Sequence, residues 1–227
     1  MSLMQAAPGS APSAMGFPDD YPVAKAIVNG TEVILRPLKQ PLYDTELIAT
    51  PTAVTQVTFF QRPQSQATLA LIKTIAETNM TASGQLPSPL HFSIFGFVFE
   101  VQPNTSAANF NQLYAASAFT FQFGGNRIYL QIPLQRIPGG VGPTGYASTT
   151  VGASTIGAVQ NGTGVVSNVY GFTINRKALQ IRPNEAFNAN VQWPTAAPTL
   201  TGFDFLGNAI TTLRLRVYLV GIFYQSL

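Results

Sequence analysis

Few residues in this chain are of the types that perform catalysis or bind metals. His91 is the single histidine and there is no cysteine, which excludes a thiolate nucleophile, a disulfide framework and every zinc motif built on two histidines. His91 stands at the start of an apolar segment, where a histidine is usually an ordinary residue at the end of a strand. We therefore predict no metal site and no cofactor.

The acidic residues include one pair whose spacing is of chemical interest. A glycosidase needs two carboxyl groups across a cleft, and Asp44 and Glu46 would share one face of a strand. On a surface strand, acids at this spacing are usually solvated or ion-paired. Residues 139–143 resemble a phosphate-binding loop in glycine content alone, because no Lys-Ser/Thr pair follows them. We predict no catalytic residue and no enzyme activity.

Alternating and β-branched segments predict the strands that would position these side chains. Asn29-Gly30 is a strong signal for a tight turn, so Val23–Val28 and Thr31–Leu35 are predicted to form a hairpin. A second predicted hairpin, Phe119–Phe123 with Arg127–Ile132, is joined by a glycine-containing turn. The other predicted strands are Ala53–Phe60, His91–Val101, Val169–Ile174, Ala178–Ile181, Glu185–Trp193 and Thr211–Tyr224.

The remaining segments are predicted to lie outside these strands or to be ambiguous. Residues 1–22 are rich in proline and small residues and are predicted to be an extended N-terminal arm. Leu69–Thr78 fits either a strand or a short helix, and Phe110–Ala116 fits a helical turn. Residues 133–168, rich in Gly, Ala, Ser and Thr, are predicted to be a long loop excursion. Eight to ten strands with few helices indicate one all-β domain over residues 23–227, either a sandwich or a barrel.

The last predicted strand separates two kinds of side chain. One face would carry only aliphatic side chains, those of Leu213, Leu215, Val217 and Leu219. The opposite face would carry Arg214 and Arg216. We predict that these two arginines donate ion pairs at an interface between subunits if their face is not covered within the subunit itself.

Charge is scarce in this chain. Charged residues make up 9% of it, against roughly 25% in an average soluble domain. A free monomer needs charge to stay dispersed, whereas a subunit of an assembly can cover its flanks with Gln, Asn, Thr and Ser. The net charge of +3 comes from scattered residues, so sequence-specific binding of nucleic acid is not predicted. No apolar run is long enough to span a bilayer, and no secretory signal is recognised.

Several segments together resemble the jelly-roll major capsid proteins of tailless icosahedral bacteriophages, many of which contain a membrane. The resemblance lies in the character of these segments and in the order in which they follow one another, and it extends over most of residues 40–224. The segments that carry it are Pro41-Leu-Tyr-Asp-Thr-Glu-Leu-Ile48, Val57-Thr-Phe-Phe60, Lys73-Thr74 with Thr78-Asn-Met80, Gly84-Gln-Leu-Pro87 with Phe92, and Leu213-Arg-Leu-Arg-Val-Tyr-Leu-Val-Gly-Ile222.

The resemblance implies a jelly-roll β-sandwich of two antiparallel four-stranded sheets, and the chain has room for a single roll with long loops. It also implies copies of the chain joined in trimers or pseudo-hexameric capsomers, other virion proteins as neighbours, and an arm that reaches a neighbouring subunit. The expected location is the virion, after synthesis in the host cytoplasm. Because the predicted arm has no basic residue, an internal membrane or a separate packaging system is expected to contact the genome.

A second function fits the same fold class. A carbohydrate-binding jelly-roll module of a phage spike or receptor-binding protein would stack sugars on exposed aromatic rings. The candidates for such stacking are Trp193, Tyr146 and Tyr170. A lone Trp at a strand end is, however, more often a core or interface residue. Binding of glycans by a monomer would favour this second function, and self-assembly without a ligand would favour the coat.

Overall fold

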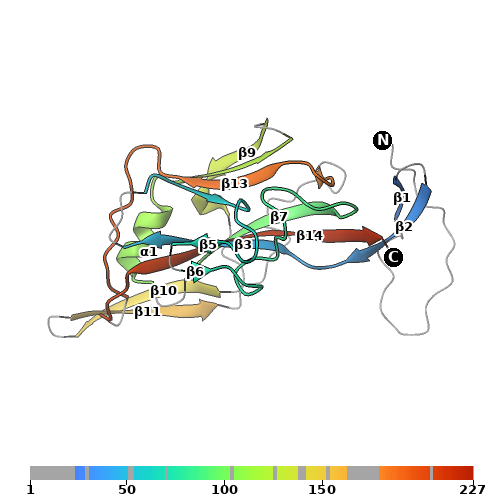
Figure 1. The fold of residues 1–227 in the computed structure, drawn as a ribbon. Helices are drawn as coiled ribbons and strands as arrows, with labels where there is room; N and C mark the ends of the chain where they lie inside the picture. The colour runs from blue at the N-terminus through green and yellow to red at the C-terminus, as the bar shows by residue number, and fades with distance from the viewer. Residues whose placement is uncertain are drawn as a thin grey trace, which may run out of the picture.

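Two antiparallel sheets pack face to face around an apolar core (Figure 1). This computed structural model describes residues 24–28, 31–50, 54–69, 71–102, 105–124, 127–137, 142–151, 154–162, 179–204 and 207–226. The predicted arm, residues 1–22, and the predicted strand Val169–Ile174 lie outside these ranges. Within them, the prediction of an all-β sandwich of antiparallel sheets is confirmed.

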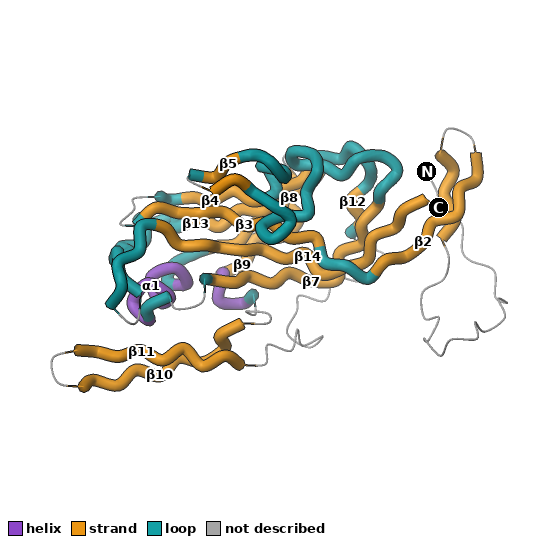
Figure 2. The backbone as a smooth tube through the Cα atoms, turned by 60° about the horizontal axis from the view of Figure 1, so that its bottom comes forward, coloured by secondary structure: helices purple, strands orange, loops and turns teal. Residues whose placement is uncertain are grey.

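The first sheet is organised around its longest strand, β14 (Thr212–Ser226). Its other strands are β1 (Ala24–Val28), β2 (Thr31–Leu38), β3 (Leu42–Ala49), β7 (His91–Val101) and β12 (Gln180–Ile181). One side of β14 pairs with β3 and then with β2, and its other side pairs with β7. The strand order is therefore β3-β14-β7-β12, and the β1–β2 hairpin continues from the far end of β14, past the second sheet (Figures 1 and 2).

The second sheet has a strand from late in the chain between two earlier ones. Its members are β4 (Gln56–Phe59), β8 (Ala118–Phe123), β9 (Arg127–Pro133) and β13 (Phe187–Gln192). They follow the order β4-β13-β8-β9, and all three pairings are antiparallel. The predicted hairpin of residues 119–123 and 127–132 is confirmed as β8–β9, with a bulge between Phe121 and Gln122.

Phenylalanine rings join the two sheets. The ring of Phe97 on β7 lies 5.3 Å from Phe119 and 5.1 Å from Phe121, both on β8. Phe59 on β4 meets Phe99 on β7 edge to face at 6.5 Å. Rings at these distances interact favourably beyond the area that they bury. The strand predicted at His91–Val101 is confirmed as β7, which has the predicted bounds, and buried residues lie on both of its faces, as in a strand covered on both sides.

Alternation along β14 matches the prediction for the last strand. Its inward positions are fully buried aliphatic side chains, Leu213, Leu215, Val217 and Leu219. Arg214 and Arg216 lie on the opposite, outer face, where both side chains are partly exposed. The period of two is therefore sufficient to assign the faces of this strand from sequence.

Short elements complete the described part of the chain. They are α1 (Ala107–Tyr114), a 3₁₀ turn (Leu134–Arg136), the small hairpin β5 (Ala67–Thr68) with β6 (Leu71–Ile72), and the hairpin β10 (Gly142–Val151) with β11 (Ser154–Gly162). Ser106 caps α1 by accepting a hydrogen bond from the backbone N–H of Asn109. No helix in these ranges is long and apolar enough to cross a membrane.

Two predictions for segments between the main strands need correction. Residues 133–168, predicted as a loop excursion, contain the β10–β11 hairpin, because Thr and Val occur often enough among the glycines to form paired strands. This hairpin pairs with no other described strand and lies outside the sandwich in Figures 1 and 2. Leu69–Thr78 holds only the two residues of β6, followed by a turn. The helical turn predicted at Phe110–Ala116 overlaps α1, which begins earlier and ends at Tyr114.

Candidate functional site

Charged side chains are buried at the edge of the sandwich, between β3 and β4. Asp44 and Glu46 lie opposite Val217 and Leu215 of β14 in the sheet register, and directly paired residues share a face. Both acids therefore point to the core side of their sheet, and both are buried. The expectation of a surface strand is wrong here: the spacing places the two acids on one face, as predicted, but that face is the inner one.

Lys73 enters this site from the segment that links β4 to β7. Its ammonium nitrogen Nζ lies 2.7 Å from Asp44 Oδ1 and 2.7 Å from Glu46 Oε1. Lys73 is itself buried. We call the group formed by Asp44, Glu46, Arg62, Thr68 and Lys73 the Lys73 cluster. A charge removed from water in this way is tolerated only when it is paired and its remaining hydrogen-bonding groups are satisfied.

The remaining oxygens of the two acids are also bonded. Glu46 Oε2 accepts from Arg62 Nη1 at 2.5 Å and from the hydroxyl of Thr68 at 2.6 Å. Asp44 Oδ2 accepts from the backbone N–H of Phe60 at 2.6 Å. Phe60 has a φ of 69°, which is strained for a bulky residue, so Asp44 fixes the chain at the point where it turns away from β4.

The environment changes the acidity of this cluster. Burial raises the pKa of Asp44 to about 6, against the opposing attraction of Lys73. A carboxyl group with such a pKa changes its charge in mildly acidic solution. Every oxygen of the acid pair is already occupied by a partner within the chain, so the pair has the geometry of a structural anchor and not that of two carboxyl groups facing a substrate cleft.

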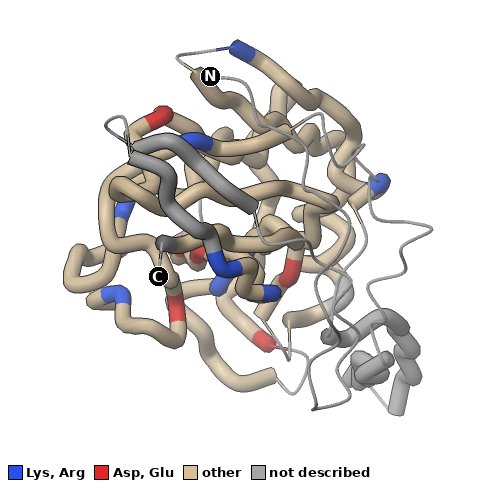
Figure 3. Tube along the Cα trace, turned by 90° about the vertical axis from the view of Figure 1, so that its right-hand side faces the viewer, with Lys and Arg blue, Asp and Glu red and all other residues tan. Residues whose placement is uncertain are grey.

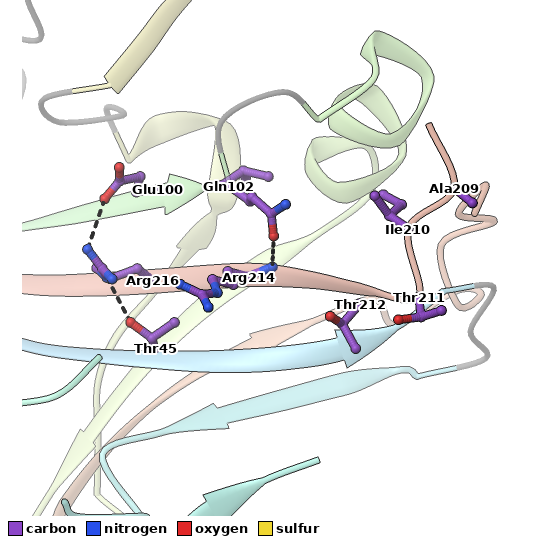
Figure 4. Close-up of a pocket in the computed structure, with 10 residues that line it drawn as sticks. Thr45, Glu100, Gln102, Ala209, Ile210, Thr211, Thr212, Arg214 and Arg216 are labelled. Atoms are coloured by element: carbon purple, nitrogen blue, oxygen red, sulfur yellow. Dashed lines mark hydrogen bonds and ion pairs between the residues drawn. The ribbon is translucent and has the colours of Figure 1, made fainter. Parts of the chain in front are cut away.

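A second polar site lies on the outer face of the same sheet. A groove of about 640 Å³ runs beside the start of β14 (Figure 4) and is lined by residues that include Thr45, Glu100, Gln102, Ile210, Arg214 and Arg216. Gln102 is one of these lining residues, and its side chain accepts a hydrogen bond from the backbone N–H of Arg214 at 3.1 Å. The groove is the place to which the structure brings the two predicted interface arginines.

These two arginines are not equally available to a partner. Arg216 donates to the hydroxyl of Thr45 at 2.7 Å, to the hydroxyl of Tyr218 and to the carbonyl of Ala76, and its Nη1 lies 4.0 Å from Glu100 Oε2. Arg214 has a looser contact, 3.9 Å to Glu77, and its side chain is about half exposed. Arg216 thus binds the segment that carries Ala76, whereas Arg214 remains the more accessible predicted interface residue.

Of the three residues predicted for sugar stacking, the structure describes the side chain of Trp193. Trp193 is only 2% exposed, and its indole N–H donates to the carbonyl of Leu113 at 2.9 Å, so it is a core residue and offers no ring face to a ligand. Tyr146 belongs to β10, but its side chain lies outside the described part of the structure. Tyr170 lies outside the described residues altogether.

His91 occupies the predicted place at the start of β7 and is partly buried. Burial, aided by the nearby positive charge of Arg182, lowers the pKa of its imidazole. No group of three or more His, Asp or Glu side chains placed to hold a metal ion occurs among the described residues.

Lys73, Arg62 and Thr68 were not identified as site residues from sequence. One signal was present in the sequence. Asp44 and Glu46 alternate in step with the apolar residues Leu42 and Ile48 at every second position, which indicates that the acids share the buried face of the strand. Their partner Lys73 is 29 positions from Asp44 and no local pattern specifies it.

Searches against protein-family models, curated proteins and solved structures gave no match.

Proposed function

We propose that this chain is a viral coat subunit with a single jelly-roll domain, which assembles with copies of itself into an icosahedral shell. The observation that supports this most is the strand order. Jelly rolls consist of eight strands in two Greek keys and are common in viral capsids. In such a roll the first, eighth, third and sixth strands form one sheet, and the second, seventh, fourth and fifth form the other.

The two sheets have this order when eight strands are counted as the roll. With β3, β4, β7, β8, β9, β12, β13 and β14 as strands one to eight, the orders are β3-β14-β7-β12 and β4-β13-β8-β9. The β1–β2 hairpin precedes this set, and the β10–β11 hairpin and the β5–β6 hairpin are insertions between its strands. The proposal therefore needs no strand to change sheet.

The scarcity of charge supports assembly as the role of this roll. Figure 3 shows that Lys, Arg, Asp and Glu occupy few positions along the described trace and that several of these positions lie close to one another, so most of the trace carries no charge. Desolvation of an uncharged polar group costs less free energy than desolvation of an unpaired charge. Large contacts between copies therefore form with a small desolvation penalty. The proposal includes copies of the same chain, joined in trimers or pseudo-hexameric capsomers, as partners. It also includes other virion proteins and an internal membrane.

Light scattering across a dilution series tests this proposal, together with electron microscopy of particles from the native source. We expect concentration-dependent assembly without any ligand and the chain in the particle. A chain that stays monomeric at every concentration and is absent from every particle would contradict it. Glycan binding by a stable monomer would favour the carbohydrate-binding module instead, but burial of Trp193 removes one of its three stacking candidates.

A further inference from the structure

In the segment around β5 and β6, polar side chains are buried and aliphatic side chains are exposed, which is the reverse of the usual arrangement. Thr68, Lys73 and Glu77 are buried there, although charged side chains are almost never buried unless paired. Three aliphatic side chains of the same segment point outward. Their exposed fractions are 59% for Leu69, 63% for Ile72 and 70% for Ile75. We call these three residues the aliphatic patch.

The segment that carries the patch is fixed to the sandwich from within. Lys73 is held by its two ion pairs, and its backbone N–H and C=O bond Gln66 and Ser65 at 2.9 and 2.8 Å. The carbonyl of Ile75 accepts a hydrogen bond from the hydroxyl of Tyr43. Because the polar anchors hold the backbone, the exposed aliphatic side chains are presented on a rigid support, which lowers the entropy lost on binding.

The turn of the small hairpin adds a second unusual feature. Leu69 has a φ of 50°, a conformation that favours Gly or Asn and is strained for Leu. A Gly or Asn at this position would relieve the strain and remove the exposed apolar side chain. The chain has neither, so the local structure offers no reason for a leucine here.

We propose that the aliphatic patch is the centre of a contact with a second copy of this chain. This inference rests on the proposed function and names the surface that it uses. Three side chains exposed to this degree within residues 69–75 present in total on the order of 300 Å² of apolar surface, against about 300–600 Å² for the largest patch on a typical monomer. A specific interface needs roughly 800 Å² on each partner, so the patch supplies its apolar core and the surrounding polar residues supply its rim.

The rim is suited to a copy of the same chain because it is almost uncharged. Its exposed residues are Ser65, Gln66, Ala67, Thr74 and Ala76, and the two exposed charges nearby, Arg62 and Arg214, each lie against a buried acid, Glu46 and Glu77. Two copies can therefore approach through this surface without repulsion between like charges. Ala76 also accepts from Arg216, so the patch continues into the outer face of β14 that carries the predicted interface arginines.

The first test is a thiol-protection experiment, which the absence of cysteine makes clean. In the Ile75→Cys variant, the single thiol is labelled with a maleimide in the dilute monomer and in the assembled protein. We expect labelling in the assembly to be slower by at least about tenfold, because contact with a neighbour excludes the reagent. Equal rates in the two states would overturn the inference.

The second test is a substitution with a matched control. We expect the Ile72→Ser/Ile75→Ser double variant to keep the thermal unfolding midpoint of the wild type within a few degrees, since both side chains are already exposed. We expect its self-association constant to fall roughly 100-fold, because the apolar core of the contact is lost. Ile128→Ser removes another exposed isoleucine, 52% exposed, and should lower the constant by less than about threefold.

The outcomes separate this inference from the proposed function. If the wild type assembles and the self-association constant falls equally in the double variant and in Ile128→Ser, the inference about the patch is overturned and the coat proposal stands. The same holds if the double variant assembles as well as the wild type. A wild type that never associates would overturn both. Protection of the Ile75→Cys thiol by phosphatidylcholine vesicles, without protection on assembly, would assign the patch to a lipid surface and overturn the contact between copies.

Discussion

At the scale of single residues, Lys73 has the largest expected effect on stability. Replacing it with Met keeps most of its volume but leaves the carboxylates of Asp44 and Glu46 buried without their shared cation. We expect Lys73→Met to lower the free energy of unfolding by about 3–5 kcal/mol in urea denaturation. Arg62→Met is the control: it removes a partly exposed partner of Glu46 and should cost less than about 1 kcal/mol.

The cluster also offers a compensating variant. When Asp44→Asn and Glu46→Gln are combined with Lys73→Met, no unpaired charge of this group remains buried. We expect the triple variant to recover at least about half of the stability lost in Lys73→Met. If the triple variant is as unstable as the single one, packing of the lysine stem and not its charge is the main contribution of Lys73.

The raised pKa of Asp44 predicts a dependence of stability on pH with a definite sign. Its value in the folded chain is about 6, above the ordinary value of 3.8. A carboxyl group with a raised pKa contributes stability that is fully present below the ordinary value and is lost as the pH rises through 6. We expect the wild type to lose stability relative to Asp44→Asn between pH 4 and pH 7, measured by urea denaturation at each pH. A difference that stays constant, or that grows in favour of the wild type, would contradict this assignment.

At the scale of elements, the pairing of β14 with β7 depends on Gly221. The register of this pair shifts between Val220 and Gly221, and a Cβ atom on Gly221 would lie 2.1 Å from the carbonyl oxygen of Ser93 and 2.6 Å from the ring of Phe92. We expect Gly221→Ala to lower the free energy of unfolding by about 3 kcal/mol, since backbone must move to make room. Gly202→Ala, whose nearest contact is 3.3 Å, should cost less than about 1 kcal/mol in the same denaturation experiment.

Strands with an apolar pattern were predictable from sequence, and those with polar inward positions were not. β7 and β14 follow continuous or alternating apolar residues, so burial of their side chains determines both their type and their faces. β3 places Asp44 and Glu46 inside, and only a lysine far along the chain makes this stable. Leu69–Thr78, which fitted either a strand or a short helix, was ambiguous for the same reason, since its conformation depends on Lys73 reaching the cluster and not on local propensity.

At the scale of the whole molecule, the low charge content predicts how assembly responds to salt. Contacts between uncharged polar and aliphatic surfaces are not screened, whereas exposed ion pairs weaken as the Debye length shortens. We expect the self-association constant to change by less than about threefold between about 0.05 and 0.5 M NaCl, measured by analytical ultracentrifugation. A fall of more than about tenfold would mean that ion pairs, with Arg214 the best placed of the predicted donors, dominate the contact.

The position of β13 and β14 in the two sheets also determines the order of events while the chain is being made. β13 lies between β4 and β8, and β14 separates β7 from both β2 and β3, so each sheet receives a central strand only after the strands on both sides of it have been made. Arg216 and its partner Thr45, for example, are 171 positions apart. Whatever follows residue 226, the nascent chain carries unpaired strand edges on the ribosome until these two strands emerge. A shortened translation product without β14 lacks the strand that joins β3 to β7, so we expect it not to form the first sheet and not to enter an assembly that selects for the native surface.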